Sequence, residues 1–182
     1  MWLINVHNGI KEKNITPINI NQYPAIKKHL DCYYSVLEKR TDKGITPYNL
    51  RNCAYMDDFN QQKIVYREIS DAMNGCIVDS DFILNNKCYF ITGEHLIYLL
   101  SYLNSKLFTK IILPQVNTTG GKGEKFLNSI TAICPTEEIE KKFLYLYKSR
   151  MENQANVDLE IDTLFCKLYE LSYDEEKYIL AD

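Results

Sequence analysis

The sequence of 182 residues has no Cys-x-x-Cys pair and no long apolar run. Its six cysteines are scattered singly, so neither a zinc knuckle nor a dithiol redox motif is indicated, and we expect reduced, buried thiols. No apolar stretch approaches the roughly 20 residues of a membrane helix, and the first residues lack the basic and then apolar pattern of a secretory signal. These absences predict a soluble, cytoplasmic protein that does not enter a membrane.

The composition is that of an ordinary globular protein. Hydrophobic residues make up 46% and charged residues 25%, and the length suits one domain or a domain with a small helical appendage. The formal net charge is -3, which opposes binding to nucleic acid. The acidic residues gather in the last third of the chain, however, so residues 1–125 can carry a basic face.

Short runs of β-branched, aromatic and other apolar residues predict the strands. They are residues 2–6, 63–69, 76–84 and 87–92, and the run from Phe126 to Ile133 is also extended in character. Asn85-Asn86 separates two of these runs and indicates a hairpin between them.

Apolar residues at steps of three and four predict the helices. These run from Pro24 toward Gly44, from Thr92 to Pro114, from Thr136 to about Asn153, and as a helical pair from Val157 to the end. We expect Thr92 to cap the second helix, Pro114 to stop it, and Ser172 with Glu175 to form a capping box. The predicted fold class is α/β (α+β), a mixed twisted sheet with packed helices. Residues 1–135 would form one domain and 136–182 a C-terminal helical region.

Two segments resemble the same known family. They are Glu38-Lys39-Arg40-Thr41-Asp42-Lys43-Gly44-Ile45-Thr46-Pro47-Tyr48-Asn49-Leu50-Arg51 and Lys63-Ile64-Val65-Tyr66-Arg67-Glu68-Ile69. Further similar stretches follow the family's order: His7-Asn8-Gly9-Ile10, Tyr23 to Leu30, Leu103 to Leu107, and Ile161 to Leu171. Nearly the whole chain thus resembles the C-terminal target-recognition domain of type II restriction-modification enzymes with an adenine-specific DNA methyltransferase, the TaqI-like specificity domain. Tyr66 departs from the pattern, since tryptophan is frequent at that position.

The resemblance implies a domain without catalysis of its own, which recognises a sequence in double-stranded DNA. It would position that DNA for a methyltransferase or endonuclease in another domain or subunit of a bacterial enzyme. The residues agree with this, because the five prolines are never adjacent and no Gly-x-Gly follows a strand and opens a helix. The loop that holds a flipped adenine and the turn that holds the methyl donor are therefore missing. We expect no catalytic residue, cofactor or metal in this chain.

The candidate DNA-binding residues are cationic or hydrogen-bonding side chains of three segments. They are Arg40, Lys43, Asn49 and Arg51 around the first family-like turn, Lys63 and Arg67 in the second segment, and Asn117, Thr118, Thr119, Lys122 and Lys125 in a glycine-rich loop. Lysine and arginine suit phosphates, while asparagine and arginine also read adenine and guanine edges. The alternatives are a solvated helix end for Arg40 and an ordinary sheet surface for Lys63 and Arg67.

Other interpretations stay open beside DNA contact. The loop Gly120 to Lys125 is compatible with a nucleotide site or a flexible surface loop, although it lacks the Ser or Thr of the Walker pattern. Asp162 with Glu175-Glu176-Lys177 superficially matches a nuclease, but these residues lie in predicted helices. The alternative function is a helical protein-interaction subunit with little DNA binding of its own. It would dock on a methyltransferase or nuclease chain through Leu164 and Leu168.

Overall fold

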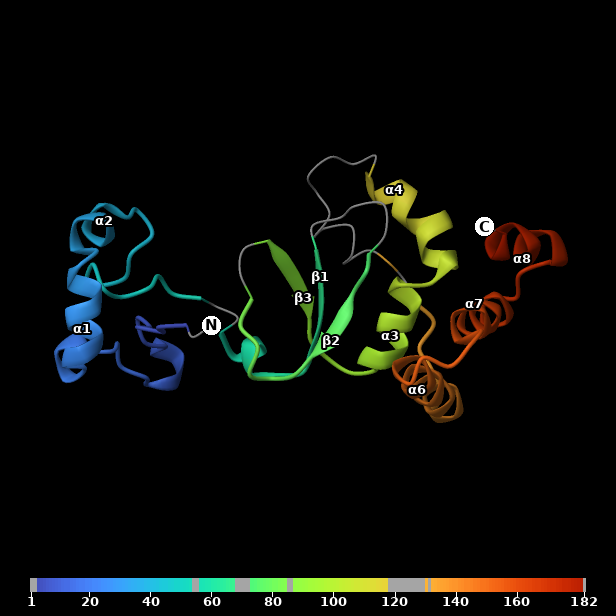
Figure 1. Ribbon diagram of the computed structural model, residues 1–182, viewed down its shortest axis with the longest axis horizontal. Coiled ribbons are helices and arrows are strands. Elements are labelled where there is room, and N and C mark those ends of the chain that lie inside the picture. Colours follow the sequence, from blue (N-terminus) through green and yellow to red (C-terminus); the bar gives the residue numbers. More distant parts are fainter. Residues whose placement is uncertain are drawn as a thin grey trace. The chain divides into compact units, whose positions relative to one another are not determined.

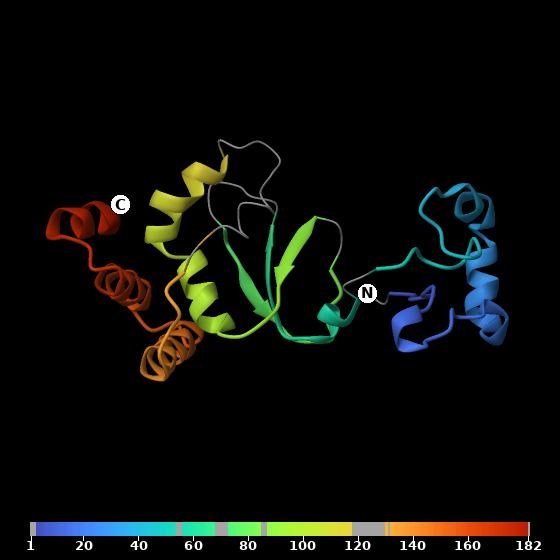
Figure 2. The same ribbon diagram turned by 180° about the vertical axis from the view of Figure 1, so that it is seen from behind.

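The computed structural model divides the chain into two compact units, unit 1 (Met1–Met56) and unit 2 (Asp57–Asp182), which Figures 1 and 2 show from opposite sides. The structure describes residues 3–53, 56–67, 73–84, 87–117, 130 and 132–181, except for the side chains of 116 and 117. The compact units therefore separate at residue 56, and the domain boundary expected at residue 135 does not coincide with this division.

Unit 1 is built from short elements. They are η1 (Lys11–Lys13), η2 (Ile20–Gln22), α1 (Pro24–Asp31) and α2 (Tyr34–Lys39). The prediction of a single helix after Pro24 is wrong, since the structure has α1 and α2 there. Cys32 N and Tyr33 N donate to carbonyls three residues earlier, which tightens the last turn of α1 and ends it. The strand expected at residues 2–6 is also wrong for residues 3–6, which are irregular. Val6 is nevertheless buried, and Leu50 N donates to Val6 O at 2.8 Å.

Unit 2 begins with η3 (Met56–Asn60) and contains a three-stranded antiparallel sheet (Figure 1). Its strands are β1 (Lys63–Arg67), β2 (Cys76–Val78) and β3 (Cys88–Ile91), in the order β2-β1-β3. The predicted hairpin between β2 and β3 is wrong, because β1 lies between them and pairs with both. The α+β fold class is confirmed. The central strand of the sheet is β1, and its residues 63–66 are all buried.

A sharp bend divides the helix expected between Thr92 and Pro114. This part of the chain forms α3 (Leu96–Leu103), the π-helical turn η4 (Phe108–Ile112) and α4 (Leu113–Asn117). The direction of the chain changes by 57° between α3 and the helical segment Phe108–Gln115. At the bend, side-chain oxygens of Asp162 and Ser105 accept from Lys106 N and Phe108 N, which replaces helical hydrogen bonds.

Two details at the ends of this helix also differ from the prediction. The residue at the start of α3 is His95 rather than Thr92, and Pro114 lies in the first turn of α4, where its missing N–H is tolerated. No single helix in the described residues is long and apolar enough to cross a membrane. The two segments on either side of the bend meet that test only when taken together.

Three C-terminal helices complete unit 2 as predicted: α6 (Glu137–Met151), α7 (Val157–Leu168) and α8 (Tyr173–Leu180). Thr136 accepts from Ile139 N at the start of α6, and Ser172 N donates to Glu175 at 2.8 Å in the expected capping box. In Figures 1 and 2, α3 lies between the sheet and α6, with α7 beyond α6 and α8 beyond α7, in agreement with their contacts.

The core of unit 2 joins the sheet to these helices. An aromatic cluster of Tyr98, Tyr102, Phe143 and Phe165 connects α3 with α6 and α7, and its rings lie 4.7 to 5.6 Å apart between centroids. Such packing is worth more than area burial alone. The C-terminal helices therefore share one core with α3, which explains why residues 136–182 do not separate as their own compact unit.

Candidate nucleic-acid interface

Positive charge is concentrated in unit 1. Its 56 residues contain eight lysines and arginines against four aspartates and glutamates, a formal charge of +4, which leaves -7 on residues 57–182. A basic surface is the main electrostatic requirement for binding a phosphate backbone. The basic part of the chain is thus shorter than the expected residues 1–125, and counting charges before residue 57 would have identified it.

The first family-like segment forms a closed turn in unit 1, here called the 40–51 turn. Gly44 N donates to Asn49 O at 2.9 Å, and Lys43 pairs with Leu50 in an antiparallel bridge. Leu50 N also donates to Val6 O, so the turn is held against the N-terminal segment. This arrangement places residues 40–51 next to the similar stretch His7-Asn8-Gly9-Ile10.

Two candidate DNA-binding residues hold this turn together through hydrogen bonds: Asn49 is buried and Arg40 is partly buried. The Asn49 side chain is 1% exposed; its Nδ2 donates to His7 O and Ile18 O, and its Oδ1 accepts from the Thr46 hydroxyl. Arg40 donates from one guanidinium nitrogen to Pro47 O and Asn49 O, at 3.0 and 3.1 Å. Base reading by Asn49 is therefore contradicted by its burial. The main-chain carbonyls that Arg40 binds give it a structural role in the turn.

The remaining candidates of the turn do face solvent. Arg51 is exposed, and so are Lys43 and the neighbouring Lys39. Lys43 Nζ donates to Glu38 O at 2.6 Å, which fixes the ammonium group near the end of α2 but uses one of its three protons. The surface of the 40–51 turn thus presents two cations supported by a hydrogen-bonded frame, and Lys39 adds a third at the end of α2.

A tyrosine of the turn joins it to α1. Tyr48 Oη donates to Asp31 at 2.6 Å, and Lys27 Nζ binds the same carboxylate at 3.0 Å while lying 5.5 Å from the centre of the Tyr48 ring. The hydrogen bond from Tyr48, followed by that from Lys27, holds the pKa of Asp31 below its ordinary value. The hydrogen bond to Asp31 raises the pKa of Lys27. Asp31 thus stays ionised and neutralises Lys27, which leaves the positive charge of unit 1 on other residues.

Lys63 and Arg67, on β1 of unit 2, are placed very differently. Lys63 is fully buried and its Nζ donates to Asp79 O at 3.0 Å, so the expected basic face of the strand is contradicted at this residue. The aliphatic part of a lysine packs well inside a protein when its ammonium group finds an oxygen. Arg67 is exposed at the end of β1, opposite Cys88. Contact between Arg67 and DNA remains a prediction.

The candidates of the glycine-rich loop fall outside the described part of the chain. Thr118, Thr119, Lys122 and Lys125 belong to residues 118–129, and of Asn117 only the helical backbone at the end of α4 is described. Their contact with DNA stays a prediction, and so do the two alternatives for residues 120–125.

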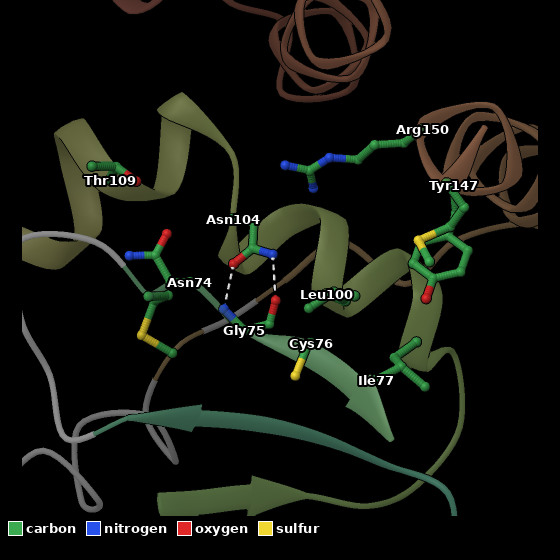
Figure 3. A pocket seen from close by; sticks show the side chains of 11 residues that line it. Asn74, Gly75, Cys76, Ile77, Leu100, Asn104, Thr109, Tyr147 and Arg150 are labelled. Atoms are coloured by element: carbon green, nitrogen blue, oxygen red, sulfur yellow. Dashed lines mark hydrogen bonds between the residues drawn. The ribbon is translucent and has the colours of Figure 1, made fainter. Parts of the chain in front are cut away.

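A cavity of about 470 Å³ lies in unit 2 between β2, α3 and α6 (Figure 3). Asn104, directly after α3, pairs with the backbone of Gly75, accepting from its N–H and donating to its carbonyl, both at 2.9 Å. Arg150 extends from α6 toward the cavity, and its Nε donates to Asp158. None of the candidate residues in the described part of the chain lines this cavity, and Asn104 and Arg150 already bind other groups of the protein.

The residues of the superficial nuclease pattern have structural roles. Asp162 is buried in α7 and accepts from Lys106 N at 2.8 Å, while Glu175 forms the capping box of α8. Burial raises the pKa of Asp162. Within the described residues, no three His, Cys, Asp or Glu side chains gather closely enough to hold a metal ion.

The cysteines are more open than predicted. Of the six, Cys166 is buried as expected, whereas Cys32, Cys76 and Cys134 are exposed, and all are free thiols. Cys76 is exposed because it lies on β2, at the edge of the sheet.

Comparison with known proteins identifies the family of this chain. No curated protein matches the chain. The family model of the TaqI-like C-terminal specificity domain matches residues 9–130, about two thirds of the chain, and includes both the 40–51 turn and the sheet. Membership of this family supports a role in target recognition in restriction-modification systems. The chain belongs to the family of TaqI-like C-terminal specificity domains.

Proposed function

We propose that this chain is the sequence-specific recognition module for double-stranded DNA of a bacterial type II restriction-modification system. It holds DNA for an adenine-specific methyltransferase or endonuclease located in another domain or subunit, and it catalyses no reaction itself. One observation carries this proposal: a member of a specificity-domain family with a net charge of -3 concentrates a charge of +4 in its first 56 residues.

The cations of unit 1 divide naturally between two tasks. Exposed lysines and arginines bind phosphates, which fixes the register of the protein on the duplex, whereas hydrogen-bonding side chains read base edges. We assign the first task to three exposed residues: Lys43 and Arg51 of the 40–51 turn, and Lys39 at the end of α2. The hydrogen bonds of the turn hold the backbone of Lys43 and Arg51 in place, so less conformational entropy is lost on binding.

The methyl donor and the flipped adenine belong, in this proposal, to the catalytic partner. The chain itself would bind no cofactor. The acidic unit 2, with a formal charge of -7, repels the DNA backbone and so favours binding through unit 1. The alternative of a protein-docking subunit is less well supported, because Leu164 and Leu168, its expected anchors, pack against the core of unit 2.

The proposal is tested by the salt dependence of duplex binding. The double variant Arg51→Ala, Lys39→Ala removes two exposed cations of unit 1, and Lys142→Ala, Lys148→Ala removes two exposed cations of α6 as a matched control. Each phosphate that the protein no longer neutralises lowers the slope of log affinity against log salt by about 0.9. We expect a slope lower by about 2 in the first variant and an unchanged slope in the control.

Two results would overturn this assignment. One is a parent protein whose affinity for duplexes does not respond to salt. The other is a control variant whose affinity falls as much as that of the unit 1 variant. The first would exclude binding to phosphates, and the second would move the DNA-binding surface to the acidic unit.

A further inference from the structure

Two asparagines of unit 1, 44 residues apart, are hydrogen-bonded at its surface. Asn8 Nδ2 donates to Asn52 Oδ1 at 2.8 Å, and Asn8 Oδ1 accepts from Ile45 N, also at 2.8 Å. Asn52 is exposed and directly follows Arg51. The main chain of the 40–51 turn, Asn8 and Asn52 therefore form a short relay that ends in a solvent-facing amide.

The relay determines which way both amides point. Ile45 N can only donate, so the atom of Asn8 that faces it must be oxygen. The nitrogen of Asn8 is then the group that faces Asn52, and a nitrogen donor requires the oxygen of Asn52. The NH2 group of Asn52 consequently points away from Asn8. Its oxygen keeps a second lone pair.

Two glycines allow Asn8 to reach this position. A Cβ atom on Gly44 would lie 2.4 Å from Asn8 Oδ1 and 2.7 Å from Leu50 O, so any side chain there would displace Asn8. Gly9 has a φ of +79°, and a Cβ atom there would meet Ile15 O at 2.5 Å. The close approach of Asn8 to the turn thus depends on residues that lack side chains.

Stability alone explains this relay poorly. A hydrogen bond between two exposed amides contributes little, because water replaces it at small cost. What the relay achieves is a fixed orientation for one exposed amide on the basic unit of the protein. A group held in its binding orientation loses less entropy when it binds.

We propose that Asn52 is a specificity-determining residue that reads an adenine edge in the major groove, with Asn8 as its positioning residue. The free NH2 group donates to adenine N7, and the remaining lone pair of the oxygen accepts from the adenine N6 amino group, the usual bidentate pairing of asparagine with adenine. Arg51 binds the adjacent phosphate and brings Asn52 to the groove. This inference rests on the proposed function, because it names the residue that reads sequence within it.

The test is selection of bound duplexes from a randomised library by the parent and by Asn52→Ala. We expect the parent to enrich a short motif that contains an adenine. The variant should lose discrimination at that one position by about 5- to 150-fold, the range for one bidentate pairing. Its preference at the other positions and its salt slope should stay unchanged. Asn52→Asp should prefer cytosine there, because a carboxylate accepts from the cytosine amino group.

A second variant tests the relay without changing Asn52. In Asn8→Asp, one oxygen still accepts from Ile45 N, but the other now requires a donor, so the Asn52 amide must turn round and present its oxygen to solvent. The same position of the motif should lose its adenine preference. The control Asn21→Asp makes the same charge change at an exposed asparagine of unit 1 and should leave the motif intact.

The outcomes separate the two proposals. A parent that enriches no motif overturns the proposed function and this inference with it. A motif that survives in full in Asn52→Ala overturns the inference and leaves the proposed function standing. A uniform loss at all positions, with faster amide exchange in the 40–51 turn, would show that Asn52 only supports the turn. That result would also overturn the inference.

Discussion

Replacing Asn49 by alanine tests whether this residue supports the fold or reads DNA. Its buried amide binds three groups: the carbonyls of His7 and Ile18, and the hydroxyl of Thr46. These groups belong to the N-terminal segment, the segment before η2 and the 40–51 turn. Asn49→Ala removes all three connections at once, so we expect unit 1 to lose stability.

The size of the effect follows from the partners left behind. His7 O keeps a second hydrogen bond from Ile18 N, whereas Ile18 O and the Thr46 hydroxyl lose a partner in a partly buried region. Removing a hydrogen bond costs about 0.5 to 1.5 kcal/mol net, and more where a buried group stays unpaired. We expect unit 1 to lose about 2 to 4 kcal/mol, the sum over these groups.

Hydrogen exchange of single amides measures this loss in unit 1 alone. The reporters are Gly44 N, Leu50 N and Ile18 N, which all donate to main-chain oxygens around the turn. Because tenfold in an equilibrium corresponds to about 1.4 kcal/mol, their exchange should accelerate about 30- to 1,000-fold. Asn21→Ala, at an exposed position of the same unit, is the control and should change exchange little. Unchanged exchange together with a fall in DNA affinity would refute the structural role of Asn49.

Three further expectations concern other sites. Gly44→Ala should destabilise unit 1 by about 1 to 3 kcal/mol, since its Cβ atom would displace Asn8, and the same amides would report it. Lys63→Met should leave the salt slope of DNA binding unchanged, because the ammonium group is buried against Asp79 O; a lower slope would return Lys63 to the interface. Burial raises the pKa of Asp162, so this carboxyl contributes stability below its unfolded pKa and loses it as pH rises through the folded pKa. Asp162→Asn keeps the acceptor for Lys106 N, so denaturant titrations should show its free energy of unfolding rising relative to that of the parent as pH rises. In Asp162→Ala, the free energy of unfolding should fall by about 1 to 3 kcal/mol.

Local signals in the sequence were sufficient where an element is stabilised by its own residues. The start of α6 follows from Thr136 and the glutamates after it, and the start of α8 from Ser172 and Glu175. The strand at Lys63–Arg67 follows from its β-branched and aromatic residues. The two helix starts were predictable because their interacting groups lie within four residues of one another, and the strand because its residue types favour extended backbone.

Predictions failed where distant residues decide the outcome. The bend after α3 depends on Asp162, which lies 56 residues beyond Lys106 in sequence. The position of β1 between β2 and β3 depends on pairings that the apolar runs alone do not specify. Lys63 and Asn49 have side chains typical of a DNA surface, and their burial depends on Asp79, His7 and Ile18.

Residue identity, order and charge were enough to establish the family of this protein, its α+β class and the basic character of its first 56 residues. Which polar residues are free to meet a ligand became clear only from the three-dimensional arrangement. The fold buries Asn49 and Lys63 and leaves Arg51 exposed. It also joins Asn8 by a hydrogen bond to Asn52, 44 residues later in the sequence. A polar side chain is taken from solvent only when the fold supplies its hydrogen-bond partners, and those partners come from distant parts of the chain.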